Sequence, residues 1–461
     1  MLDVTYNYIP AHRNPYERRS IGGDMLHNVS LPLRYEPGGY MTPESGIELG
    51  HAIASGHRTV AVVSDWMRSS RMMKEALISG ILSHGSDVVD AGCAAEPAAA
   101  YAARMCDCSV FVTEGSSSGH ISGYRMFNRD GSPFTDEQVR HLTAVHGGPK
   151  GQEPAAPGRR MPYGRAVEDY NAYMASVLGN MGGAPVVLDC GCGVVSESAP
   201  QILERAGVEV ISVNCHHGMD FMPKDPESDA DEFGWLHDSI SKKEGFIGIG
   251  LNRAGSRVTV MDEDGDVIDP SMALALVVRA LKPMKVVASM DTSSVIEHAF
   301  RDNGIEGSEY LLSSPRLTEV ISEMVREDAD LAVCRDRIMY RGLPTPDGIR
   351  TAAIIASMAD SNSLKRTCGS MPTYYRSTAS IRLECDEDAF VRALEERARA
   401  TGRCRFACQE GWRIDMDEGW FLIGYPRDSV VDISAEATDR AYQISLVDTA
   451  SDLVKSCSHS Q

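Results

Sequence analysis

The sequence predicts an α/β fold, with three similar mixed α/β domains followed by a smaller α+β domain. Short apolar segments typical of buried strands alternate with helical segments through most of the chain, which favours parallel sheets. The length of 461 residues exceeds one typical domain, and a Pro/Gly-rich stretch at 147–162 indicates a linker. We place the domains at 1–155, 156–258, 259–369 and 370–461.

The first domain is predicted from a regular succession of strands and helices. Its strands are mainly Val and Ala, and one of its helices consists almost entirely of small residues. A Gly/Ser-rich loop follows its third strand, and a short strand and a turn then lead into a helix. In order, the elements are a strand at 59–64, a helix at 72–82, a strand at 87–91, a helix at 97–105 and a strand at 110–112.

The remaining domains are predicted in the same way. The second contains a helix at 167–178, a strand at 185–188, a helix at 199–206 and a strand at 208–213. The third contains a helix at 271–281, a strand at 285–289 and helices at 318–326 and 348–359. The last differs, with a strand at 380–385, a helix at 386–401 and strands around Trp412 and Trp420, and this pattern indicates an α+β unit.

Composition limits the function classes. The net charge of −20 argues against nucleic acid as a partner, because phosphate-backbone binding needs a basic face. No apolar run approaches the roughly 20 residues that cross a bilayer, so no membrane partner is expected. The first 20 residues lack an apolar signal region, and we therefore expect a cytoplasmic protein. Its 12 cysteines are then reduced, and their spacing matches no zinc site.

The Gly/Ser-rich loop carries a resemblance. The chain reads G-Y-R-M-F-N-R-D-G at 123–131 and F-T-D-E-Q at 134–138, which resembles the active-site segment of the alpha-D-phosphohexomutases, the phosphoglucomutase, phosphomannomutase and phosphoglucosamine mutase family. Segments at 41–50, 72–92, 186–214 and 410–424 resemble other parts of the family in the same order. The resemblance covers nearly the whole chain. It implies four domains around a central cleft and a phosphosugar as the ligand.

At the first family site, the expected nucleophile is missing. The family has a T-A-S-H-N-P loop whose serine carries the transferred phosphoryl group, and Gly115 stands at that serine position. Ser116 is one residue further, so it reaches the family position only if the loop shifts by roughly 3.5 Å. Thr113 and Ser117 are candidate phosphate contacts. Arg125 stands where the family often has a lysine, and arginine binds phosphate but is a poor general base.

At the second site, the resemblance implies magnesium held by the carboxylates of D-G-D-x-D-R. The matching loop of this chain reads N-R-A-G-S-R at 252–257, with Asn252, Ala254 and Ser256 at the carboxylate positions. The formal charge of the motif changes from −2 to +2 when its variable residue is neutral. Arg253 and Arg257 repel a divalent cation but suit an anion, so no metal is expected here. The acidic run at 262–264 indicates a hairpin turn.

The third and fourth sites are altered as well. The family's sugar-selecting G-E-x-S-x-H loop falls near 333–337, where this chain has Arg335 and Arg337, although a solvated charged loop is an equally good interpretation. The family's C-terminal phosphate loop corresponds to G-Y-P-R-D-S at 424–429, in which Arg427 and Ser429 remain as anion contacts. Arg68 resembles an arginine of the family's R-D-T-R segment.

Three hypotheses follow from these departures. The first is a phosphohexomutase homologue that has lost serine and magnesium phosphoryl transfer, a pseudoenzyme that binds a small phosphosugar-like anion in an arginine-rich cleft without a cofactor. The second is an active phosphosugar mutase, an intramolecular phosphotransferase that uses Ser116 or Ser117 and, in the family manner, magnesium. The third is different chemistry in the same cleft, with His120 or His217 as proton carriers.

Overall fold

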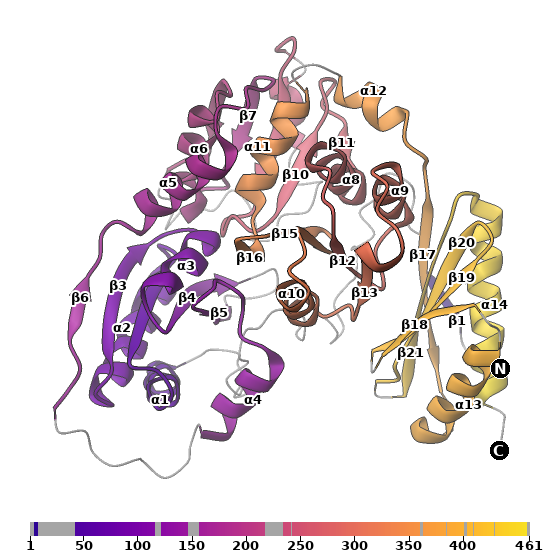
Figure 1. Ribbon diagram of the computed structural model, residues 1–461, viewed down its shortest axis with the longest axis horizontal. Coiled ribbons are helices and arrows are strands. Elements are labelled where there is room, and N and C mark those ends of the chain that lie inside the picture. Colours follow the sequence, from indigo (N-terminus) through magenta and orange to yellow (C-terminus); the bar gives the residue numbers. More distant parts are fainter. Residues whose placement is uncertain are drawn as a thin grey trace.

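The protein is a mixed α/β chain whose four sheets lie in sequence order around an arch (Figure 1). This computed structural model describes residues 4–7, 42–115, 121–145, 156–216, 234–240, 242–359, 363–383, 385–400, 403–408, 410–427 and 429–458. The predicted fold class is confirmed. We call the four sheets with their helices units one to four, and the predicted boundaries between domains stay predictions.

Unit one has a five-stranded sheet in the order β5-β4-β2-β3-β6, parallel except where β5 pairs with β4. Gly80 lies where the helices α1 and α2 cross, and a Cβ there would stand 2.2 Å from the carbonyl oxygen of Ile47. The elements are α1 (Pro43–Ala54), β2 (Thr59–Ser64), α2 (Arg68–Ser83), β3 (Asp87–Cys93), α3 (Glu96–Ala102), β4 (Cys108–Gly115), β5 (Ile121–Asn128), α4 (Asp136–Val145) and β6 (Arg160–Pro162).

Unit two has the strand order β11-β10-β9-β7-β8, so the two strands that follow the loop 252–257 complete its sheet. The acidic run at 262–264 forms the predicted hairpin turn between β10 and β11. The elements are α5 (Ala166–Leu178), β7 (Val186–Asp189), α6 (Ala199–Arg205), β8 (Val210–Val213), α7 (Gly234–Ile240), β9 (Ile247–Leu251), β10 (Val258–Met261) and β11 (Val267–Ile268).

Unit three has the strand order β13-β12-β14-β15-β16, with a tight hairpin between β14 and β15. Its helix α11 also packs against α6, β9 and β10 of unit two. The elements are α8 (Pro270–Leu281), β12 (Val286–Ser289), α9 (Ser294–Asp302), β13 (Tyr310–Ser313), α10 (Leu317–Arg326), β14 (Leu331–Cys334), β15 (Arg337–Tyr340), β16 (Leu343–Pro346), α11 (Gly348–Ala359) and α12 (Leu364–Gly369).

Unit four is an antiparallel sheet in the order β1-β17-β21-β20-β19-β18, and its edge strand β1 comes from the start of the chain. The first and the last described elements of the chain, β1 and α14, therefore both lie in this unit (Figure 1). The elements are β1 (Val4–Asn7), β17 (Tyr375–Arg382), α13 (Glu387–Ala400), β18 (Cys404–Cys408), β19 (Gly411–Met416), β20 (Gly419–Gly424), β21 (Val430–Ala437) and α14 (Arg440–Ser458).

The hydrophobic core of unit four is separate from the largest core, which joins the other three units. One continuous apolar cluster contains side chains of units one, two and three, from Ala61 to Met371. Unit four has a separate cluster under its own two helices. Apolar burial therefore joins the first three units, whereas unit four contacts unit three through the polar groups described below.

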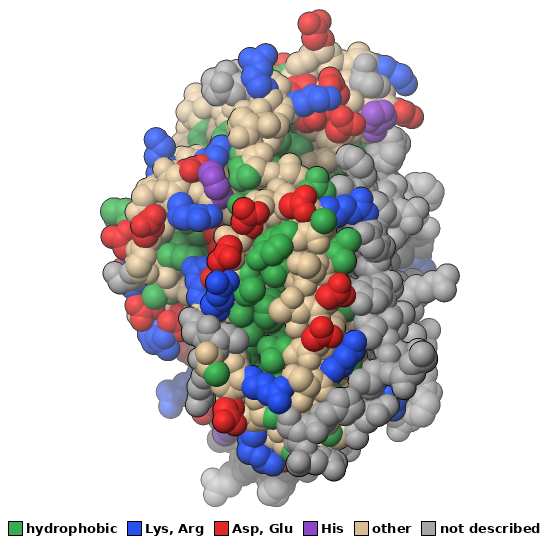
Figure 2. All heavy atoms as spheres, turned by 90° about the vertical axis from the view of Figure 1, so that its right-hand side faces the viewer, with side chains coloured by type: hydrophobic (Ala, Val, Ile, Leu, Met, Phe, Trp, Pro, Cys, Tyr) green, Lys and Arg blue, Asp and Glu red, His purple; other side chains and the backbone are tan. Residues whose placement is uncertain are grey.

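Most large apolar side chains are buried, and the visible surface of unit four is mixed. No helix in the described part of the chain is long and apolar enough to cross a bilayer. On the side that faces outward from unit four, a strip of hydrophobic side chains is bordered by interspersed acidic and basic residues (Figure 2). The described residues of this face form no continuous basic stripe of the kind that polyanion binding requires.

Candidate functional site

The first loop begins at the end of β4, where buried polar groups meet. The Thr113 hydroxyl donates to Oδ2 of Asp65 at 2.9 Å, and Oδ1 of Asp65 accepts the backbone N–H of Met67 at 3.0 Å. Strand β4 extends to Gly115, which pairs with Ile121. Ser116, Ser117 and His120 lie outside the described residues, so their places stay predictions. The structure thus gives Asp65 as a carboxylate near the loop that sequence reasoning missed.

Arg125 forms an ion pair. Its guanidinium contacts Glu96, the first residue of α3, and both side chains are largely buried. The carboxylate holds the guanidinium beside the N-terminus of α3, and arginine does not release its proton in proteins. Arg125 can therefore orient a phosphate or the neighbouring loop, whereas proton transfer requires another group.

The side chain of Asn252 forms hydrogen bonds within the loop 252–257. Oδ1 of Asn252 accepts the backbone N–H groups of Ser256 and Arg257 at 2.8 and 2.9 Å, and Nδ2 donates to the Ser256 hydroxyl at 3.2 Å. The amide oxygen is thus used inside the loop. No group of three His, Cys, Asp or Glu side chains that could hold a metal ion occurs among the described residues. These residues do not fit the magnesium site of the family, which needs several oxygen ligands.

The same loop joins three units. The carbonyl of Ala254 accepts the N–H of Glu96 at 2.9 Å, and the carbonyl of Gly255 accepts the N–H of Gly348 at 3.0 Å. It therefore lies between the first residues of α3 and α11. Nη2 of the buried Arg253 lies 2.5 Å from the sulfur of Met67. The family's metal-loop position is here a structural junction of units one, two and three.

The third loop is the hairpin turn between β14 and β15, and it meets the second loop. Nε of Arg257 lies 3.4 Å from Oδ2 of Asp336, and Nε of Arg337 lies 3.9 Å from Oδ1 of the same carboxylate. Arg335 has a left-handed backbone (φ 58°), and its Nε contacts Oδ2 of Asp291 at 3.0 Å. The structure brings Arg257, Arg335 and Arg337 together.

Charge in this cluster favours an anion. Burial alone would raise the pKa of Asp336, but the guanidiniums of Arg257 and Arg337 hold it below the ordinary value of 3.8. Burial also opposes ionisation of Asp291, and Arg335 with Arg376 lowers its pKa. Both carboxylates are therefore ionised at neutral pH. Among the described residues, the guanidiniums around these two carboxylates, those of Arg257, Arg335, Arg337 and Arg376, outnumber them.

The described contacts of the fourth loop involve residues of unit four. Arg427 is exposed, and its backbone bridges Val430. Ser429 has a φ of 61°, and its backbone N–H donates to Oε1 of Glu387 at 2.7 Å. Arg68 is exposed at the start of α2. The predicted anion contacts at these positions stay predictions.

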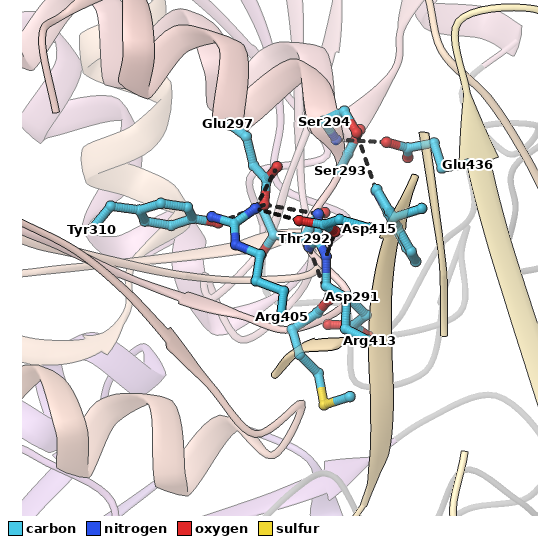
Figure 3. Close-up of polar contacts among 12 residues, drawn as sticks. Asp291, Thr292, Ser293, Ser294, Glu297, Tyr310, Arg405, Arg413, Asp415 and Glu436 are labelled. Carbon is cyan, nitrogen blue, oxygen red and sulfur yellow. Dashed lines mark hydrogen bonds and ion pairs between the residues drawn. The ribbon is translucent and has the colours of Figure 1, made fainter. Parts of the chain in front are cut away.

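A buried polar network joins unit four to unit three (Figure 3). Arg413 of β19 is 1% exposed at its side chain and contacts Glu297 and Asp415, each at 2.9 Å. Its Nη1 donates to the carbonyls of Met290 and Thr292 at 3.0 and 3.4 Å. These carbonyls belong to the segment after β12 that also contains Asp291. The network therefore fixes the backbone behind the arginine cluster.

Further contacts hold the same segment from unit four. The indole of Trp420 donates to the Ser294 hydroxyl at 3.1 Å, and Glu436 accepts the Ser294 N–H at 2.5 Å. The guanidiniums of Arg376 and Arg413 lie 5.1 and 4.6 Å from the centre of the Trp420 ring. The sequence marked β20 only by its tryptophan, because the hydrogen-bond partner of Trp420, Ser294, lies 126 positions away.

One arginine connects units one, three and four. Arg316, before α10, contacts Asp136 of α4 and Glu410 before β19, each at 2.6 Å. Hydroxyls of Thr318 and Ser314 donate to the same two carboxylates at 3.2 and 3.1 Å. The Glu410 side chain is 5% exposed and that of Asp136 41%. The contact to unit four is thus buried, and the contact to unit one is open to water.

Comparisons with known proteins agree with this architecture. Residues 33–146 match the family model described as phosphoglucomutase/phosphomannomutase, alpha/beta/alpha domain I. A solved phosphoglucomutase/phosphomannomutase family protein from Burkholderia thailandensis is 18% identical, with a TM-score of 0.76 over 91% of this chain and 95% of that chain. At this identity the likeness concerns the fold.

Curated relatives match over most of their length. A protein named probable phosphoglucosamine mutase from Methanococcoides burtonii is 26% identical, over 88% of this chain and 94% of the relative. A phosphopentomutase from Thermococcus kodakarensis is 28% identical, over 83% of this chain and 87% of the relative. The two names share phosphosugar isomerisation and differ in the sugar.

Proposed function

Because this chain belongs to the alpha-D-phosphohexomutase family, we propose that it is an active phosphosugar mutase, an intramolecular phosphotransferase. The observation that carries the proposal is the match of curated mutases across nearly the whole chain. It favours the second of the three hypotheses from the sequence over the loss of phosphoryl transfer. The different sugars named for these relatives leave the substrate class at a phosphorylated sugar.

In the proposed reaction, a loop hydroxyl gives its phosphoryl group to one sugar oxygen and takes another from a second sugar oxygen. The candidate is Ser116, with Ser117 next to it, at the end of β4. The proton of the attacking hydroxyl needs an acceptor, and Arg125 cannot serve. Asp65, which accepts from Thr113 at 2.9 Å, is the carboxylate we assign to this role.

Negative charge on the transferred group needs a counter-charge. The loop 252–257 does not fit magnesium, so no step is assigned to a metal. In the cluster of Arg257, Arg335 and Arg337 the described guanidiniums outnumber the carboxylates, and guanidiniums bind phosphate oxygens in a fixed geometry. We assign this cluster to the substrate phosphate.

The test is phosphoryl transfer to the protein. Purified protein is incubated with glucose 1,6-bisphosphate, with magnesium or with EDTA, and its intact mass is measured. We expect a gain of one phosphoryl group that persists in EDTA and is lost in Ser116→Ala, with Ser118→Ala as the matched control. No gain in the wild type under either condition would contradict the proposal.

The second candidate function is that of an anion-binding protein that does not transfer a phosphoryl group. Two observations favour it: Gly115 at the family's serine position and the loop 252–257 without carboxylates. It predicts a thermal shift with hexose phosphates, weakened in Arg335→Ala, but no phosphoryl gain. The two candidates therefore differ in the mass measurement and agree in the binding measurement.

A further inference from the structure

Three cysteines gather at the carboxyl ends of two neighbouring parallel strands. Asp189 of β7 pairs with Val213 of β8, so the loops after these strands run side by side. The N–H of Cys190 donates to the carbonyl of Val213 at 3.2 Å, and the N–H of Cys192 to the carbonyl of Asn214 at 2.7 Å. Cys215 is the next residue, and its Sγ donates at 3.2 Å to the same Val213 carbonyl that accepts the Cys190 N–H.

The thiol of Cys215 therefore lies beside Cys190, and both residues are reduced in this structure. Cys190 is fully buried, whereas Cys215 is partly exposed and is followed by the exposed His216. An oxidant therefore reaches Cys215 first, and Cys190 is the neighbouring cysteine whose N–H shares an acceptor with it.

Their acidities differ in the order that disulfide formation needs. The hydrogen bond from Cys190 lowers the pKa of the Cys215 thiol, although its partial burial acts in the opposite direction. Burial raises the pKa of Cys190. The attacking species in thiol oxidation is the thiolate, so Cys215 is the more reactive of the two.

Neither Cys192 nor a metal ion gives a better interpretation of these cysteines than thiol chemistry between Cys190 and Cys215. Cys192 lies 3.6 Å from Nε2 of His216, but its sulfur is fully buried, and burial raises its pKa. The described residues contain no cluster of three side chains suited to a metal ion. Thiol chemistry between Cys190 and Cys215 is what the arrangement supports.

We propose that Cys190 and Cys215 form a reversible disulfide when the protein meets a peroxide. The Cys215 thiolate attacks one peroxide oxygen, which gives a sulfenic acid and releases hydroxide. The Cys190 sulfur then attacks the Cys215 sulfur, loses its proton and displaces a second hydroxide. The net change is two thiols and hydrogen peroxide to one disulfide and two waters, and a dithiol reverses it.

The site adjoins a contact between units one and two. The indole N–H of Trp66 donates to the carbonyl of Cys192 at 3.1 Å, and Cys192 lies two residues from the proposed bond. Gly193 follows, and a Cβ there would stand 2.3 Å from Cα of Arg253. Oxidation would therefore occur in a loop that has little room to move.

The chain offers a direct assay. Trypsin cuts after Arg165, Arg205 and Lys224, so Cys190 and Cys192 lie in peptide 166–205 and Cys215 in peptide 206–224. The wild-type protein is treated with hydrogen peroxide, alkylated, digested and analysed by mass spectrometry. We expect the two peptides linked, two fewer alkylated thiols, and reversal by dithiothreitol.

Variants and fragment ions assign the bond. The link is expected to vanish in Cys190→Ser and Cys215→Ser and to remain in Cys192→Ser. Fragment ions of the linked wild-type peptides separate Cys190 from Cys192 even if a variant does not fold. A link through Cys192, or sulfinic acid at Cys215 with no link, would overturn the proposal.

Discussion

Replacing Arg413 by Met tests whether the polar network holds unit four on unit three. The substitution keeps an unbranched apolar side chain in the buried space and removes the guanidinium. It deletes two ion-pair contacts at 2.9 Å and two hydrogen bonds to the carbonyls of Met290 and Thr292. Because the side chain is 1% exposed, water cannot readily replace these contacts.

The expected loss of stability depends on which contacts the partners of Arg413 lose and which they keep. Breaking a buried ion pair from one side costs about 3–5 kcal/mol, and each carbonyl left without a donor adds about 1–3 kcal/mol. Glu297 keeps Arg405 at 3.4 Å and the Tyr310 hydroxyl at 2.6 Å, which offsets part of the loss. These terms overlap, and we expect a loss of about 4 kcal/mol in the free energy of unfolding of units three and four.

The assay is thermal unfolding with a matched control. For units three and four together, a loss of about 4 kcal/mol in the free energy of unfolding corresponds to a melting temperature lowered by about 10 °C. The control is Arg403→Met, because Arg403 contacts Asp417 at 3.1 Å with both side chains widely exposed, and such pairs contribute less than about 1 kcal/mol. A shift no larger than that of the control would refute the reasoning.

Three further predictions use other contacts. Arg316→Met removes the link between units one and four, and we expect a larger radius of gyration by small-angle X-ray scattering; an unchanged value would contradict this. The folded pKa of Asp336 is below 3.8, so its ion pairs stabilise the protein above that pH and are lost as the pH falls through the folded value. In an acid titration, the Asp336→Asn protein should therefore unfold at a less acidic pH than the wild type. Unfolding of both proteins at the same pH would show that these ion pairs do not stabilise the fold. Gly193→Ala should cost about 1–3 kcal/mol in urea unfolding, because the added methyl meets the backbone of Arg253, whereas Gly56→Ala, with open space around it, should not.

Much of the fold was predictable because buried strands and amphipathic helices have simple patterns. The strand at 59–64 and the helix at 348–359 match the structure at both ends. Helix α2 begins at Arg68, four residues before the predicted start, because its first turn is polar and the apolar pattern begins later. Strand β16 was missed because it contains Pro344 and Pro346; its place at the edge of the sheet tolerates them.

The sequence named the arginines of the candidate site but not their partners. Arg257, Arg335 and Arg337 lie close together, and their role as anion contacts stays a prediction. The R-D-R sequence at 335–337 contained a signal for Asp336, since neighbouring opposite charges commonly pair. Asp291 lies 44 positions from Arg335, and no local pattern connects them. Long-range pairing depends on the assembled units.

Strand β1 is synthesised long before the other strands of the sheet to which it belongs. During synthesis, domains generally fold as they emerge, starting from the N-terminus. Residues 4–7 pair with Thr378–Ile381 of β17, so they must wait while the first three units are completed. Unit four therefore closes last and from both ends of the chain. A tag or truncation at residue 1 should act on the C-terminal sheet, although the two are neighbours only in space.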